Sequence, residues 1–189
     1  MADLILRVLT PDDTEMLFEH YRDLDPASKG CRFGIQFSDT ALRHFLSQLD
    51  LNRDIHFAVV EKNTILALAQ VSQYMGHNDH RLELGISVAT NARRKGYASL
   101  LWTCATDHAI ACNMREIYVL HSPRNHAMAT FCRSKGLRLE NELGERIGIW
   151  TNPNMVDVPR DDDEAPKGWP GILPWPIPLD TDVPTSLTV

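Results

Sequence analysis

The sequence lacks long apolar runs, and this absence limits what the chain can be. No segment approaches the roughly 20 consecutive apolar residues of a membrane-spanning helix, so we expect no membrane partner. Residues 1–7 also lack a basic stretch followed by a long apolar one, so we expect no secretory signal. The four cysteines form no C-x-x-C pair, which indicates free thiols and a cytoplasmic location rather than a disulfide framework.

A basic excess is missing as well. The formal net charge is −6, of which residues 151–189 contribute −5 through seven acidic and two basic side chains. Residues 1–150 are therefore close to neutral, at −1. Because nucleic-acid-binding surfaces are usually strongly basic, we expect no nucleic-acid partner. A local basic site can still bind a small anion.

The hydrophobic patterns predict a mixed α/β or α+β fold, with strands and helices alternating and no internal repeat. Thr10-Pro11 and Ser38 are typical of helix starts. Residues 25–30 are predicted to be a loop. The predicted strands cover residues 4–9, 55–60, 65–72, 82–88, 116–121, 137–143 and 146–151. The predicted helices begin near residues 10, 38, 97 and 125.

The composition changes after Thr151. Eight of the eleven prolines lie beyond it, and the segment 169–178 has neither a helical nor a strand period. We therefore predict a domain at residues 1–151 and an acidic, Pro/Trp-rich extension at 152–189. The extension is expected to pack on the body or on a partner subunit, with a homodimer as one arrangement. The side chains expected to make that contact are Trp169, Ile172, Leu173 and Trp175.

A basic turn, Arg93–Ser99, is the candidate functional feature. It follows the strand-like run 82–88 and opens a helix that continues to about Cys112. A helix N-terminus presents N–H groups and positive dipole to anions, and Gly96 lets the backbone approach a ligand closely. Neither G-x-G-x-x-G nor a P-loop signature is present. The pattern alone leaves open a phosphate cradle or a solvated turn that merely starts a helix.

Two motifs at a suitable separation resemble the GCN5-related N-acetyltransferase (GNAT) superfamily. The first is Q/R-x-x-G-x-G/A, which reads Arg93-Arg94-Lys95-Gly96-Tyr97-Ala98. The second is an Asn followed by a helix that ends in a K-x-G-F type turn, which begins here at Asn125 and ends at Lys135-Gly136-Leu137. The order of elements over residues 4–151 also fits. The resemblance implies a mostly antiparallel, splayed central sheet of six to seven strands, flanked by about four helices.

The resemblance also implies acetyl-CoA as the donor and an amine as the acceptor. Backbone groups of Ile86, Ser87 and Val88 would pair with the pantetheine arm. The turn would hold the pyrophosphate, with N–H groups from Arg94 onward and with added positive charge. Asn125 would lie near the thiol end; an ordinary helix cap is the other interpretation, and both can be true. The implied cofactor-binding residues of the turn are Arg93, Arg94, Lys95, Gly96, Tyr97, Ala98 and Ser99.

Transfer to an amine needs a base, because an amine with an ordinary pKa near 10.4 is protonated at pH 7. Glu83 is the first candidate, since its position resembles that of a glutamate in some GNAT protein-lysine acetyltransferases. His121 is the second candidate and His56 the third. Cys132 stands where many family members have a tyrosine acid, and it is either a proton donor or a small buried residue.

No metal is expected, because His77 and His80 stand in a loop without a third ligand. Residues 28–34 resemble a Ser-x-x-x-Arg-Phe stretch that would line the acceptor side. The sequence thus predicts an acetyl-CoA-dependent N-acetyltransferase acting on a protein lysine or a small amine. The alternative is a non-catalytic acyl-CoA-binding sensor or scaffold with the same fold.

Overall fold

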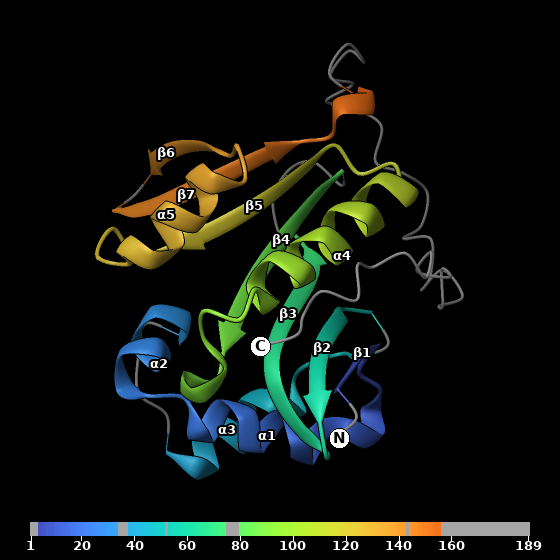
Figure 1. Cartoon of the computed structure of the whole chain (residues 1–189), viewed down its shortest axis with the longest axis vertical. Coiled ribbons are helices and arrows are strands. Elements are labelled where there is room, and N and C mark those ends of the chain that lie inside the picture. The colour runs from blue at the N-terminus through green and yellow to red at the C-terminus, as the bar shows by residue number, and fades with distance from the viewer. Residues whose placement is uncertain (1–3, 34–37, 52, 75–79, 143, 156–189) are drawn as a thin grey trace.

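Seven strands form one sheet in the order β1-β2-β3-β4-β5-β7-β6 (Figure 1). The computed structural model describes residues 4–33, 38–51, 53–74, 80–142 and 144–155. Every neighbouring pair is antiparallel except β4 and β5, which are parallel. The mostly antiparallel sheet is therefore confirmed. The strands are β1 (Leu4–Val8), β2 (Ile55–Glu61), β3 (Thr64–Gln73), β4 (Arg81–Val88), β5 (Glu116–His121), β6 (Arg138–Glu142) and β7 (Glu145–Thr151).

Five α-helices lie in the described residues, one more than predicted. They are α1 (Thr14–Asp23), α2 (Pro26–Phe33), α3 (Asp39–Ser47), α4 (Tyr97–Ala111) and α5 (His126–Ser134). Two predicted caps are present: Thr10 and Asp13 form a capping box, and Ser38 accepts a hydrogen bond from the Ala41 N–H. A short 3₁₀ turn, Pro11–Asp13, precedes α1.

The prediction of a loop at residues 25–30 is wrong, because this segment forms most of α2. Asp25 precedes the helix and accepts hydrogen bonds from the backbone N–H and the hydroxyl of Ser28. At the other end, the Phe33 ring packs against Tyr21 and Phe45, with ring centroids 5.0 and 5.5 Å apart. Gly30 is a poor helix former and hides the helix in the sequence, but capping and aromatic packing outweigh its propensity.

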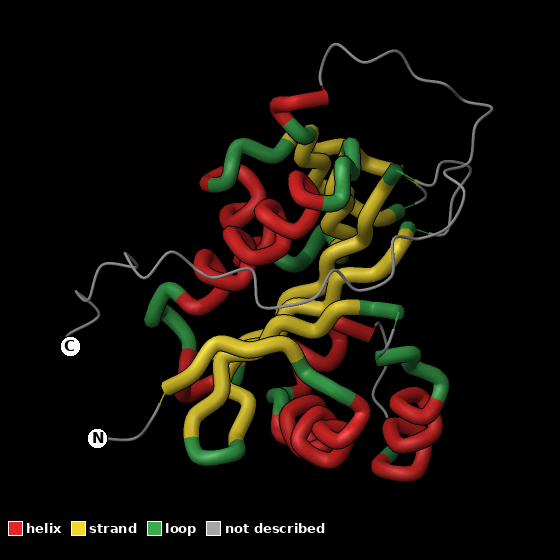
Figure 2. The backbone as a smooth tube through the Cα atoms, turned by 90° about the vertical axis from the view of Figure 1, so that its right-hand side faces the viewer, coloured by secondary structure: helices red, strands yellow, loops and turns green. Residues whose placement is uncertain are grey.

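The helices cover both faces of the sheet (Figure 2). On one face α1 and α3 enclose a core that includes Ala58 and Val60 of β2. On the other face α4 lies over a core that includes Phe57 and Val59 of the same strand. Alternate β2 residues thus enter opposite cores, which explains why β2 reads as a continuous apolar run.

The sheet opens between β4 and β5. Their register holds for three pairs only, Arg81 with Glu116, Leu82 with Ile117 and Glu83 with Tyr118. Beyond Glu83 the strands diverge (Figure 1), and β4 continues to Val88 with β3 on one side and no described strand on the other. The splay expected from the family resemblance therefore lies at the β4–β5 junction.

The described chain continues past the predicted boundary at Thr151 to Met155. The Asn152 side chain is 1% exposed and its Nδ2 donates to the Met114 carbonyl at 2.9 Å. The Asn152 backbone N–H donates to the Arg115 carbonyl at 2.8 Å, and a 3₁₀ turn, Pro153–Met155, follows. These bonds fasten the end of β7 to the start of β5. The extension beyond Met155 lies outside the described residues, so its predicted packing stays a prediction.

We propose that the extension contributes to stability or assembly, and a truncation after Met155 tests this while keeping the Asn152 bonds. Burying even one large apolar side chain stabilises a protein by about 1.5–3 kcal/mol. The truncated protein should therefore lose at least about 2 kcal/mol of unfolding free energy in urea titrations, or shift its oligomeric state in light scattering. Unchanged values for both would refute the packing of Trp169 and Trp175.

Candidate active site

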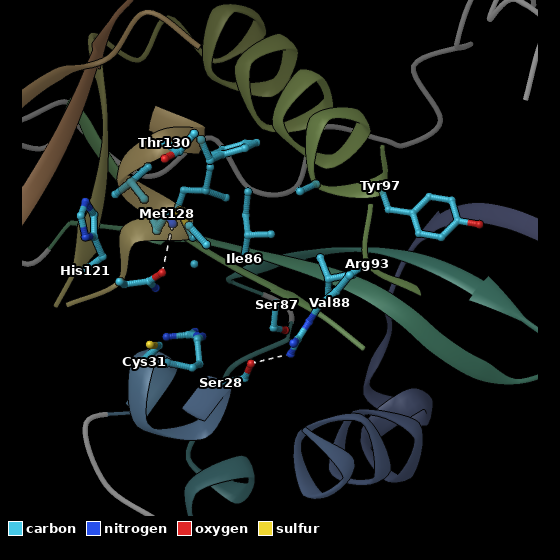
Figure 3. A pocket seen from close by; sticks show the side chains of 18 of the residues that line it. Ser28, Cys31, Ile86, Ser87, Val88, Arg93, Tyr97, His121, Met128 and Thr130 are labelled. Atoms are coloured by element: carbon cyan, nitrogen blue, oxygen red, sulfur yellow. Dashed lines mark hydrogen bonds between the residues drawn. The ribbon is translucent and has the colours of Figure 1, made fainter. Parts of the chain in front are cut away.

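A cleft of about 840 Å³ occupies the opening between β4 and β5. It is lined by α2, β4, the N-terminus of α4, the end of β5 and α5. In Figure 3, Ser28 and Cys31 of α2 lie in the lower part of the view, and His121, Met128 and Ile86 of β4 lie above them. Because α2 and α5 belong to opposite faces of the sheet, the cleft connects the two faces.

The N-terminus of α4 forms one wall of the cleft as an uncapped helix end. Gly96 occupies the N-cap position with a φ of 83°, and no side chain caps the helix. Arg94 also has a left-handed φ, 64°. The N–H groups of Tyr97 and Ala98, in the first turn, have no intrahelical acceptor and can bind an anion. Of the predicted turn residues, only Lys95 does not line the cleft.

Arg93 is held by protein groups. Its guanidinium pairs with the Asp25 carboxylate, and its Nη2 lies 2.7 Å from the Ser28 hydroxyl. The Arg93 guanidinium is also the main reason that the pKa of Asp25 lies well below its usual range. Sequence reasoning assigned this positive charge to the cofactor but did not find its partner. In the structure, Arg93 joins the turn before α4 to the start of α2.

The open edge of β4 presents backbone groups of alternate residues to the cleft. The His80 carbonyl accepts a hydrogen bond from the Arg115 N–H, on the side of β5. The Arg81 carbonyl accepts from the Tyr74 N–H and the Ala89 N–H donates to the Leu66 carbonyl, both on the side of β3. In a strand the N–H and C=O of one residue face the same side and alternate along the chain. The groups of Ile86 and Val88 therefore face the cleft. Those of Ser87 face β3.

The Ser87 side chain binds the neighbouring helix instead. Its hydroxyl lies 2.8 Å from Nε2 of His20, whose Nδ1 lies 3.0 Å from the Ile65 carbonyl. Because Nδ1 must donate to that carbonyl, Nε2 accepts from the Ser87 hydroxyl. Burial lowers the pKa of His20 to about 4, so the ring is neutral at pH 7. This contact fastens β4 to α1 beside the cleft.

Asn125 lines the cleft and also caps α5. Its Oδ1 accepts a hydrogen bond from the Met128 N–H at 3.0 Å (Figure 3). Because the cap occupies the oxygen, the Nδ2 amide is the group that remains to reach a ligand. Both interpretations of this residue are thus compatible with its geometry.

Glu83 and His121 both line the cleft, but they approach it from opposite faces. Glu83 pairs with Tyr118 at the last β4–β5 pair, where the strands separate, and its side chain lies on the α2 face. His121 is 3% exposed, and its Nδ1 lies 3.0 Å from the Ser122 carbonyl. Its Nε2 has no partner in the described residues. In the neutral tautomer that donates from Nδ1, Nε2 carries the lone pair at the cleft wall.

Two other candidates lie away from the cleft. Cys132 is fully buried, packs against the Gly148 backbone, and has a thiol pKa raised to about 11 by burial. This position is that of a small packing residue, so we give it no proton-donor role. His56 is also fully buried, and its Nδ1 lies 3.1 Å from the Asp54 carbonyl.

No three metal-ligating side chains come together in the part of the chain that the structure describes. His77 lies outside that part, so the loop pair of histidines is not described. The four cysteines are free thiols. None of the described helices is long and apolar enough to span a membrane.

Comparisons with known proteins identify the fold. In a search of solved structures, the GNAT domain of S. lividans PAT has a TM-score of 0.68 at 18% identity, covering 79% of this chain and 96% of that one. Spermidine N-acetyltransferase from Vibrio cholerae, in complex with CoA and spermine, has a TM-score of 0.62 at 17% identity, covering 79% and 95%. Phosphinothricin acetyltransferase from Sinorhizobium meliloti, in complex with AcCoA, has 0.62 at 15%, covering 78% and 88%.

These structural likenesses are too distant in sequence to show more than the fold. No curated protein matches the sequence. A family model described as the acetyltransferase (GNAT) domain matches residues 3–138, which is well over half of the chain. The fold with its mostly antiparallel sheet is thus that of a known family. The chain belongs to the GNAT acetyltransferase family of N-acyltransferases.

Proposed function

We propose that this protein transfers an acetyl group from acetyl-CoA to a primary amine, either of a small molecule or of a protein lysine. The observation that carries the proposal is the two-sided cleft. One side has an uncapped helix N-terminus and an open strand edge, and the other side has a carboxylate. The free cysteines agree with a cytoplasmic location.

The donor side suits CoA. The N–H groups of the α4 N-terminus and the exposed Arg94 would hold the pyrophosphate. The pantetheine arm would then run along β4 as an added strand and bond to Ile86 and Val88. This direction brings the thioester toward Leu84 and Asn125. The cleft-facing N–H group of Ile86 is the candidate donor to the oxyanion that forms during transfer.

The acceptor side suits an amine that must lose a proton. Glu83 lies on the α2 face, opposite the face that carries α4, so a base there meets the acceptor rather than the phosphates. Glu83 takes the proton of the ammonium directly or through water, and the amine nitrogen then attacks the thioester carbon. The C–S bond breaks, and the departing thiolate takes up a proton.

His121 lies on the α5 side of the cleft, near the expected thiol end. Its Nε2 lone pair makes it the second candidate for the base. We assign the base role to Glu83 because its side chain lies on the α2 face, where the acceptor is proposed to bind. We assign protonation of the thiolate to solvent because Cys132 does not line the cleft.

Gly96→Asp tests the donor site. A carboxylate at the α4 N-terminus would repel the pyrophosphate, and CoA affinity should fall on the order of 100-fold in calorimetry. Gly136→Asp is the matched control, since Gly136 also has a positive φ (74°), meets open space and lies outside the cleft. It carries similar backbone strain and should leave CoA affinity unchanged. Equal loss in both variants would argue against the cradle.

Glu83→Gln tests the base. Turnover should fall by about 100-fold or more, and CoA affinity should stay the same, because the side chain acts on the acceptor. The measurement is CoA release over a range of pH with a panel of amines. Glu61→Gln, at the end of β2 and outside the cleft, is the control that should keep wild-type turnover.

An unchanged pH–rate profile in Glu83→Gln would remove this residue from the mechanism. His121→Gln, measured in the same way, would then show whether His121 is the base. CoA binding without acetylation of any amine by the wild-type protein would favour the sensor over the enzyme.

A further inference from the structure

We propose that Arg32 of α2 binds a carboxylate of the acceptor, so that the acceptor is a small amine of the amino-acid class. This inference rests on the proposed acetyl transfer and concerns the other half of the same cleft. Arg32 lines the cleft together with Glu83 and Gly85 of β4. Neither the family match nor the similar structures assign a role to this side chain.

The fold builds a definite place for the Arg32 guanidinium. A Cβ added to Gly85 would stand 2.8 Å from the Arg32 Cζ and 2.9 Å from its Nη2, so the guanidinium lies directly on the β4 backbone. Gly85 is the residue that makes this close approach possible. The Arg32 Nη2 donates to the Gln70 amide oxygen, and Gln70 is 9% exposed on β3, beside Gly85. The guanidinium also lies 5.5 Å from the centre of the Phe33 ring.

The charge at this place has no counterion among the described residues. No carboxylate of those residues comes within 4 Å of the Arg32 nitrogens, and the hydrogen-bond partner, Gln70, is a neutral amide. By contrast, Arg93 at the opposite end of the cleft is paired with Asp25. A partly buried guanidinium gains most from a carboxylate, which it binds through two parallel hydrogen bonds. A substrate carboxylate would supply the counterion that the described residues do not give to Arg32.

The spacing between Arg32 and Glu83 suits one small molecule. Glu83 and Gly85 lie on the same face of β4 and are two residues apart, which is about 6–7 Å along a strand. An amine beside Glu83 would thus place a carboxylate a few bonds away beside the guanidinium over Gly85. A free amino acid meets both groups at once, whereas a simple polyamine leaves Arg32 without a partner. The geometry therefore favours acceptors that carry a carboxylate.

Matched acceptors test the inference. The full-length protein and acetyl-CoA would be assayed by CoA release with free amino acids, with their carboxamides, and with the corresponding amines that lack the carboxyl group. Wild-type kcat/KM should be at least tenfold higher for the amino acids. Arg32→Gln should lower it for the amino acids by about 10- to 100-fold, mainly through KM, because a charge-assisted interaction is lost. Values for the carboxamides should stay within about twofold.

Three further variants sharpen the test. Arg32→Lys keeps the charge but loses the planar fork, so its kcat/KM should lie between the wild type and Arg32→Gln. Gly85→Ala should displace the guanidinium without removing it and should raise KM for amino acids selectively. Lys29→Gln removes a positive charge from the same helix outside the cleft and should match the wild type. CoA affinity, measured in each variant, should not change.

The outcomes separate this inference from the proposed function. Turnover of amines with no preference for a carboxylate, or equal loss for both acceptor classes in Arg32→Gln, would overturn the role of Arg32 and leave acetyl transfer standing. Turnover of no amine at all, with CoA still bound, would overturn both.

Discussion

Beyond Glu83, the edge of β4 that faces β5 has no described strand beside it. A strand inside a protein must still satisfy its N–H and C=O groups, because an unpaired polar backbone group in a buried place costs free energy. The antiparallel partner β3 satisfies only the groups of every second residue. The remaining groups, at Ile86 and Val88, need water or an extended ligand. This requirement determines where a cofactor arm can lie.

The two sides of the cleft follow from this edge. Side chains of β4 alternate between the faces, so Leu84 enters the core under α4 while Glu83 and Gly85 face α2. The proposed acceptor-binding side chains therefore lie on the face of the sheet opposite to α4, whose N-terminus is the proposed phosphate site. The Arg93–Asp25 pair then ties the turn before α4 to the start of α2. This ion pair thus connects elements on two different sides of the cleft.

Local sequence predicted the elements whose signals are local. The uncapped start of α4 follows from Gly96, the Asn125 cap from an Asn before a helix, and the seven strands from their apolar runs. The helix at residues 26–33 was not predicted. Its stability depends on the contacts of Phe33 with Tyr21 of α1 and Phe45 of α3, and the sequence of the segment itself does not show these contacts. Helix propensity is a property of single residues, whereas side-chain packing depends on pairs of residues that can be distant in the sequence.

Roles that depend on a distant partner were the hardest to predict. Nothing near Arg93 in the sequence indicates Asp25, 68 positions earlier. Ser87 was expected to face the cofactor with its backbone, but the alternation along β4, fixed by hydrogen bonds at His80, Arg81 and Ala89, turns it toward β3. Gly85 gives no signal in the sequence, because its importance is the space it leaves for a side chain from α2.

The three residue pairs that join β4 to β5 also have a mechanical meaning. The sheet has two parts, one formed by β1 to β4 and the other by β5, β7 and β6. The backbone pairing between the two parts is short and lies at one end of β4. A ligand that bonds to β4 and contacts α5 would join the two parts of the sheet at the other end of β4. A ligand in the cleft would thus add a second connection between the two parts of the sheet, at the end where the strands themselves do not pair.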